Sequence, residues 1–121
     1  MRRAALAALV ALALGGAQAG AHAHSAAGGS LQVTAVEYRL LLSQGVVHAG
    51  PVSLELIDGG MDPHDLRLRR GRSGRGVAAP ELTAGQRWDG VVDLRPGTYH
   101  LWCSLPQHYR LGMHARLRVV P

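Results

Sequence analysis

Apolar and polar residues alternate in short segments along most of the chain, and turns rich in Gly and Pro separate these segments. The segments with this pattern, or with a run of β-branched residues, are 31–40, 51–57, 64–70, 86–94, 97–103 and 114–120. A period of two residues is typical of strands that bury one face, and almost no segment has a helical period. The pattern predicts an all-β fold, an antiparallel Greek-key β-sandwich of about seven or eight strands.

The remaining segments predict one domain at 31–121 and two looser stretches. Residues 20–30 are rich in Ala, Gly, His and Ser, and we interpret them as a flexible N-terminal tail. Residues 71–85 (GRSGRGVAAPELTAG) have the weakest pattern, and we expect a loop there, with or without a short helical turn. Neither a repeat nor a second domain is evident, and about 100 residues are enough for one modest core.

The first residues form the pattern of a secretory signal peptide at 1–19. A positive region with two Arg residues precedes an uncharged apolar stretch at 4–14, which is too short for a comfortable transmembrane helix. Small residues follow, and they predict cleavage after Ala19, with Ala21 and Ala23 as alternatives. We therefore expect an exported protein, in the bacterial periplasm, with no transmembrane span after cleavage.

Charge and cysteine content narrow the function classes. Cys103 is the single cysteine and has no disulfide partner, so an unpaired thiol in an oxidising compartment needs another role, such as that of a metal ligand. All 13 basic residues are Arg, and removal of the signal peptide leaves 11 of them against 8 acidic residues. Five Arg lie at 67–75, which is either a solvated strand end and loop or a docking patch for an acidic partner. Export argues against nucleic acid as that partner.

The parity of the strand at 97–103 predicts which side chains face the core. Tyr99 and Cys103 share one face, and Tyr99 follows a Leu-Arg-Pro-Gly-Thr run that is typical of a tyrosine corner. If the Tyr99 ring points inward, the Cys103 thiol does so too. His100 lies on the other face, and His114 falls on the outward face of the last strand, so neither is a good ligand candidate.

Four residues of the types that bind copper follow a compact spacing. Cys103, His108 and Met113 are separated by four residues each, so one loop can bend and present all three, and His64 follows a Gly-Gly-Met-Asp-Pro turn. One thiolate, two imidazoles and one thioether form the ligand set of a blue copper ion, with a trigonal His2Cys group and a long, weak bond to an axial Met. The spacing therefore predicts one mononuclear type 1 copper ion.

Two alternatives concern other copper ligands. Met61 lies close to His64 in the sequence and competes with Met113 for the axial position, or it lines the apolar rim of the site. Cleavage after Ala19 or Ala21 would expose a free amine with a His at position three, from His22 or His24, which can chelate Cu(II). The alternative is that these histidines only reflect an Ala- and His-rich tail.

The motifs resemble those of the cupredoxin family, in particular its small single-domain blue copper proteins of the plastocyanin, rusticyanin and sulfocyanin kind. The resemblance covers about residues 31–120 and includes Gly60-Met-Asp-Pro-His and Arg95-Pro-Gly-Thr-Tyr-His-Leu-Trp-Cys-Ser-Leu-Pro-Gln-His. It implies a cupredoxin-like sandwich with four copper ligands, His64, Cys103, His108 and Met113. The chain departs at Asp65, where many relatives carry an Asn that pins the two ligand loops together, and at Gln107, where Gly is common.

A site with four protein ligands leaves no open position for a substrate, so we expect a soluble one-electron carrier and no enzyme. The alternative is a periplasmic copper chaperone or buffer that delivers copper to an exported oxidase. The resemblance implies that a redox partner, such as an acidic cytochrome or a terminal oxidase, docks on an apolar patch around His108. In this chain Leu105, Pro106 and Leu111 would form that patch. We expect a monomer.

Overall fold

The computed structural model describes residues 26–72 and 76–121, so the predicted signal peptide and the His22 and His24 tail lie outside the described residues. The described chain folds into nine strands: β1 (Gly29–Val36), β2 (Arg39–Leu42), β3 (Val46–His48), β4 (Gly50–Asp58), β5 (His64–Arg70), β6 (Val77–Leu82), β7 (Arg87–Leu94), β8 (Gly97–Trp102) and β9 (His114–Val120). Within the described ranges, no helix is long and apolar enough to cross a membrane.

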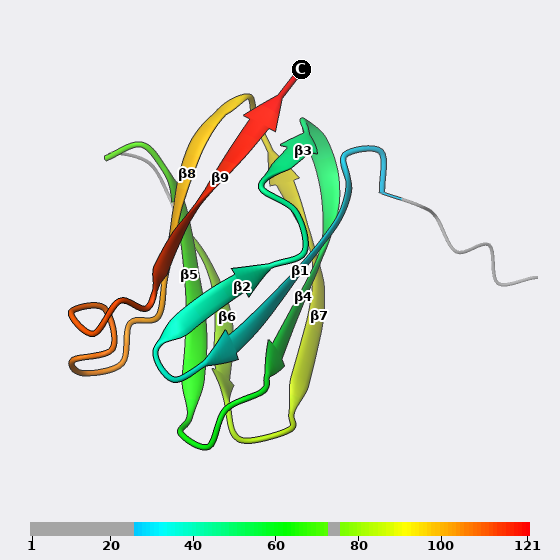
Figure 1. Ribbon diagram of the computed structural model, residues 1–121. Coiled ribbons are helices and arrows are strands. Elements are labelled where there is room, and N and C mark those ends of the chain that lie inside the picture. Colours follow the sequence, from blue (N-terminus) through cyan, green and yellow to red (C-terminus); the bar gives the residue numbers. More distant parts are fainter. Residues whose placement is uncertain (1–25, 73–75) are drawn as a thin grey trace, which may run out of the picture.

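Two sheets pack face to face (Figure 1). One has the strand order β2-β1-β4-β7, and the other has the order β3-β9-β8-β5-β6. The predicted all-β sandwich is confirmed, but both sheets are mixed, because β1 pairs with β4 and β3 pairs with β9 in parallel. A single sequence gives alternation within each strand and no information on the direction of its neighbours, so these parallel pairs were not predicted.

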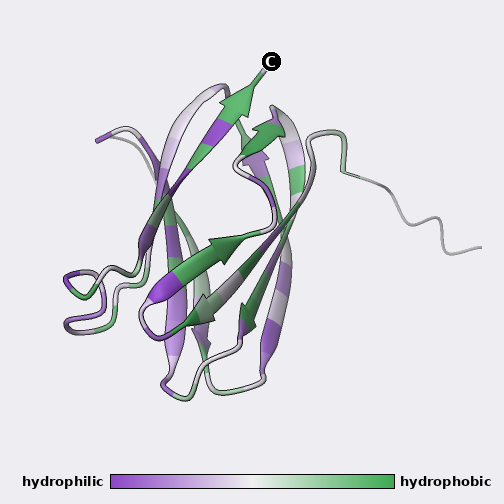
Figure 2. Cartoon of the chain, viewed as in Figure 1, coloured by the Kyte–Doolittle hydropathy of each residue, from purple (hydrophilic) through white to green (hydrophobic). Residues whose placement is uncertain are grey.

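The alternating pattern determines the core between the sheets (Figure 2). Leu101 and Cys103 are fully buried and Tyr99 is 7% exposed, whereas the side chains on the other face of β8 are partly exposed, which confirms the predicted parity. The Tyr99 hydroxyl accepts a hydrogen bond of 3.0 Å from the backbone N–H of Arg95. This bond is the predicted tyrosine corner, and it fixes the turn that leads into β8.

Two segment predictions were wrong. The strand predicted at 31–40 is broken by a turn at Glu37 and Tyr38 into β1 and β2, and β1 starts at Gly29, inside the predicted tail. The loop predicted at 71–85 contains β6, which forms the edge of the five-stranded sheet and, among the described strands, pairs only with β5. An edge strand with small residues and Pro80 has little alternation to recognise, so tertiary pairing decides its structure.

The tyrosine corner predicts the effect of removing one hydroxyl. Tyr99→Phe should lower the free energy of unfolding of the metal-free protein by about 1 kcal/mol, because it removes one largely buried hydrogen bond. Urea unfolding measures the change. Tyr109→Phe is the matched control, since the Tyr109 ring is 46% exposed. Equal effects of the two substitutions would mean that the Tyr99 hydroxyl does not stabilise the corner.

Candidate metal centre

The pairing of β5 with β8 brings the two ligand segments together. Arg67 pairs with Trp102 and Leu68 with Leu101, in an antiparallel register. The start of β5, where His64 lies, is therefore next to the end of β8, which Cys103 follows. His108 and Met113 belong to the loop between β8 and β9, which projects from one side of the sandwich in Figure 1.

Three of the predicted ligands converge. The candidate ligand atoms of His64, Cys103 and His108 all lie within 4.8 Å of one another. The distance from Cys103 Sγ to His108 Nδ1 is 3.5 Å. Metal–nitrogen and metal–sulfur bonds are about 2.0–2.3 Å long. Three ligand atoms bound to the same metal ion therefore lie about 3.5–4 Å from one another. The spacing of these atoms therefore fits a three-ligand metal site.

The His64 ring is held in the orientation that a metal ligand needs. The ring is fully buried, and its Nε2 lies 3.1 Å from Oε1 of Glu37. An ionised carboxylate only accepts hydrogen bonds, so Nε2 carries the proton and Nδ1 keeps its lone pair. Nδ1 is buried and has no hydrogen-bond partner among the described residues. A buried nitrogen with a free lone pair suits a metal ligand.

Glu37 is held in turn by the loop that precedes His64. Its Oε1 accepts hydrogen bonds from the backbone N–H groups of Met61, at 2.6 Å, and Asp62, at 2.8 Å. The bond from the Asp62 amide, with those from Met61 and His64, lowers the pKa of Glu37 to about 2, although desolvation opposes the shift. Glu37 therefore places a negative charge beside the predicted ligand His64.

The next residue, Tyr38, contacts the second histidine. The Tyr38 ring packs edge-on against the His108 ring, with the centroids 5.0 Å apart, and its hydroxyl donates to Asp62 Oδ2 at 3.2 Å. Sequence reasoning missed both Glu37 and Tyr38, because they lay within a predicted strand. No local signal marks them, since the sheet topology alone brings this turn to the ligand loops.

The two sulfur atoms lie in dry surroundings. Cys103 and Met113 are fully buried, whereas the Met61 side chain is 86% exposed, which favours Met113 over Met61 as the axial ligand. Burial raises the pKa of the Cys103 thiol, and the nearby Asp65 charge adds to the increase. A metal ion that displaced this proton would compensate for the cost of a buried thiolate.

Backbone hydrogen bonds within the loop fix its shape. The Cys103 N–H donates to the Met113 carbonyl at 3.2 Å, and the Met113 N–H donates to the His108 carbonyl at 3.0 Å. Gln107 adopts a φ of 70°, in the region where Gly is unstrained and other residues are uncommon. Gln107 stands where Gly is common in the resembling family, and its backbone therefore keeps a Gly-like conformation despite its side chain.

Asp65 links the two ligand loops. Its carboxylate accepts hydrogen bonds from the backbone N–H of Ser104 at 2.6 Å and from the Ser104 hydroxyl at 2.5 Å, and Arg67 Nε lies 3.2 Å away. Burial acts to raise the pKa of Asp65, but the two bonds from Ser104, together with the Cys103 thiol and the Arg67 charge, outweigh it and leave the pKa below its usual value. Asp65 is 3% exposed although both of its neighbours are also buried, because the register of β5 and β6 shifts between His64 and Leu66.

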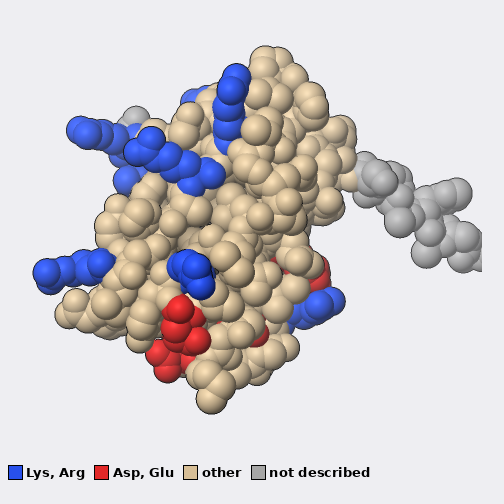
Figure 3. All heavy atoms as spheres, viewed as in Figure 1, with Lys and Arg blue, Asp and Glu red and all other residues tan. Residues whose placement is uncertain are grey.

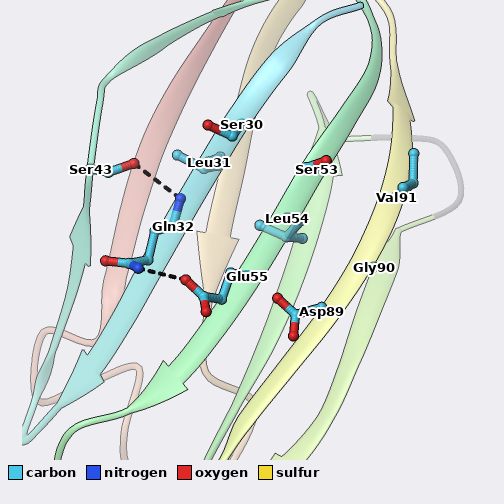
Figure 4. A pocket seen from close by; sticks show the side chains of 10 residues that line it. All are labelled: Ser30, Leu31, Gln32, Ser43, Ser53, Leu54, Glu55, Asp89, Gly90 and Val91. Atoms are coloured by element: carbon cyan, nitrogen blue, oxygen red, sulfur yellow. Dashed lines mark hydrogen bonds between the residues drawn. The ribbon is translucent and has the colours of Figure 1, made fainter. Parts of the chain in front are cut away.

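The remaining candidates lie outside this cluster. His100 and His114 face outward, as expected from the parity of their strands, and their rings lie 6.0 Å apart on the outer face of the five-stranded sheet. A cavity of about 670 Å³ lies on the outer face of the four-stranded sheet, over β1, β4 and β7 (Figure 4). Figure 4 shows Gln32, Glu55 and Asp89 around it, and no His, Cys or Met lines it.

Neither a protein-family model nor a curated protein matches the chain. Solved structures do match it. Reduced auracyanin from the photosynthetic bacterium Roseiflexus castenholzii has a TM-score of 0.63 and 17% identity, over 76% of this chain and 97% of that one. Auracyanin A, a blue copper protein from Chloroflexus aurantiacus, has a TM-score of 0.59 and 15% identity, over 75% and 98%.

A purple cupredoxin from Nitrosopumilus maritimus has a TM-score of 0.52 and 17% identity, over 74% of this chain and 98% of that one. The fold also occurs within a nitrite reductase and a multicopper oxidase, so the fold alone does not exclude an enzyme. The described chain thus has the cupredoxin fold, and its cluster of His64, Cys103, His108 and Met113 fits a single type 1 copper ion.

Proposed function

We propose that the protein is a one-electron carrier that holds one type 1 copper ion with His64, Cys103, His108 and Met113. The observation that carries the proposal is the convergence of a buried thiol and two imidazoles within 4.8 Å. The Nδ1 atom of one imidazole, His64, is buried and has no hydrogen-bond partner in the described part of the chain. When bound, the copper would supply the Cu(I)/Cu(II) couple. The protein would hold the ligands in nearly the same place in both oxidation states, because a compromise geometry needs little rearrangement.

The burial of the ligands favours a carrier over catalysis and over copper delivery. His64, Cys103 and Met113 are fully buried, and only His108 among the four is partly exposed. A substrate would need an open position, and a copper acceptor would need access to the ligands. Electron transfer needs neither, since one partly exposed ligand is enough for a partner to come close.

We also propose that the protein is exported to the bacterial periplasm. The pattern at 1–19 supports export. Partners would dock on the apolar patch that Leu105, Pro106 and Leu111 form around His108. Leu111 is 55% exposed, and an exposed Leu beside a partly exposed ligand suits brief, dry contacts.

The first test of this function is the colour of the protein. The copper-loaded protein should show an intense visible thiolate-to-copper charge-transfer band, and Cys103→Ser should abolish it, because a hydroxyl cannot replace the thiolate. Visible absorption after addition of Cu(II) measures both. Met61→Leu is the control, since an exposed methionine should not affect the band. A strong band that survives in Cys103→Ser would contradict the ligand assignment.

The second test concerns the reduction potential. Glu37→Gln should raise it, because loss of a negative charge beside His64 destabilises Cu(II) relative to Cu(I). The Gln oxygen can still accept the hydrogen bonds of Met61 and Asp62, so the loop should keep its shape. A redox titration measures the shift, and Glu81→Gln, an exposed charge change on β6, is the control. If both variants had the parent potential, the Glu37 charge would have no influence on the metal.

The third test concerns the docking patch. Leu111→Glu should slow electron self-exchange several-fold while the visible spectrum stays unchanged, because it places a hydrated charge where two copies must approach closely. NMR line broadening in mixtures of the two oxidation states gives the rate. Val91→Glu on β7 is the matched control, since Val91 is 68% exposed on the other sheet. Equal slowing by both variants would indicate an effect of net charge alone.

A further inference from the structure

The outer face of β5, β8 and β9 carries an unusual concentration of positive side chains. Arg69 on β5 pairs in register with His100 on β8, which pairs in turn with Arg116 on β9. The three residues form a row across three strands, with neighbours about 5 Å apart. Arg69 and Arg116 thus flank His100 on both sides, and like charges gathered on one face of a sheet repel each other. We call this row and its surroundings the cationic face, and its further members are Arg67, Arg72, His114 and Arg118.

This positive charge has little counter-charge in the chain. Arg67 is bonded to Asp65, but Arg69, Arg72, Arg116 and Arg118 form no ion pair with any described residue. The residues outside the described ranges contain no Asp or Glu at all, so they cannot supply one. In Figure 3 the basic side chains over β5, β8 and β9 gather on one side, away from the acidic side chains visible in this view.

The cationic face has a recess that suits an oxyanion. A cavity of about 270 Å³ is lined by Arg69, Arg72, Arg116, His100 and Thr98, among others. The Arg69 Nε atom is buried and has no hydrogen-bond acceptor among the described residues. A buried donor of this kind normally has a partner, and a guanidinium pairs best with a carboxylate or a phosphate.

The surroundings of the recess resemble a protein interface. Trp102 and Tyr109 lie next to it. The His100 ring stacks on the Trp102 ring with the centroids 5.4 Å apart, and Cζ of Arg69 lies 5.6 Å from the centroid of the Trp102 ring. Arg, Trp and Tyr are enriched in protein interfaces. Because His100 and Arg69 already contact the Trp102 ring, it is poorly available to stack on a nucleic-acid base.

We propose that the cationic face docks an acidic protein segment, with a carboxylate seated in the recess between Arg69 and Arg116. The inference rests on the proposed carrier function, which requires transient partners, and it adds a second contact surface beside the patch around His108. Tyr109 joins the two surfaces, because it follows His108 in the chain and its ring lies 5.7 Å from that of His100. Charge complementarity of this kind mainly raises the rate of association.

The test uses the copper-loaded, reduced protein and a peptide of eight glutamates. Amide NMR shifts should change on β5, β8 and β9 around Arg69, His100 and Arg116. Arg69→Gln/Arg116→Gln should weaken the peptide about tenfold, because two exposed ion pairs are lost. Arg39→Gln/Arg87→Gln removes the same net charge from the four-stranded sheet and should have little effect. Equal weakening by both pairs, or shifts elsewhere, would overturn the proposal.

Three further measurements identify the occupant. Burial lowers the pKa of His100, and the charges of His114, Arg116 and Arg69 lower it further, so a bound carboxylate should raise that pKa in an NMR titration. Stronger binding to phosphatidylglycerol vesicles than to the peptide would overturn the acidic protein partner in favour of a lipid surface. NMR shifts of the same residues when only the protein concentration is raised would overturn it in favour of a second copy of the chain. Binding of the peptide does not depend on the visible spectrum. The docking proposal can therefore fail while the copper assignment stands, and the copper assignment can fail while the docking proposal stands.

Discussion

The register between β5 and β8 is the constraint on which the rest of the site depends. It places the start of one strand beside the end of the other, and the first predicted ligand thereby meets the loop that contains the other three. A slip by one residue would turn Cys103 toward solvent, since successive side chains alternate between faces. The carboxylate of Asp65 fixes this register at its critical end, because it bonds both the backbone and the hydroxyl of Ser104.

The cluster is held by protein groups that surround it. Glu37 anchors the His64 ring, Tyr38 packs against His108, and the loop after Cys103 is held by its own backbone. This arrangement lowers the free energy of unfolding, since a buried nitrogen without a hydrogen-bond partner costs about 1–3 kcal/mol. The thiol is also held in an apolar environment. A metal ion at this position would satisfy both groups, so metal affinity and folding stability should be coupled.

The parts of the site that the sequence predicts are those that depend on local spacing. The interval from Cys103 to Met113 defines one loop, and the parity of β8 decides that Tyr99 and Cys103 face inward. Glu37, Tyr38 and the buried position of Asp65 could not be predicted in the same way, because contacts between segments distant in the sequence create them. The same reason explains the parallel strand pairs and the missed strand β6, whose structure depends on its partner β5.

Pro80 and the residue after it, Glu81, have a consequence beyond the site, because they lie on the outermost strand of the five-stranded sheet. An unpaired strand edge is a template on which another chain can add a strand, and this leads to aggregation. Proline offers no N–H to such an incoming strand, and a charged neighbour makes its approach unfavourable. The opposite edge of that sheet is β3, which has only three residues. The five-stranded sheet is therefore protected at both ends against growth by strand addition, which would help a small β-protein to stay dispersed at high concentration.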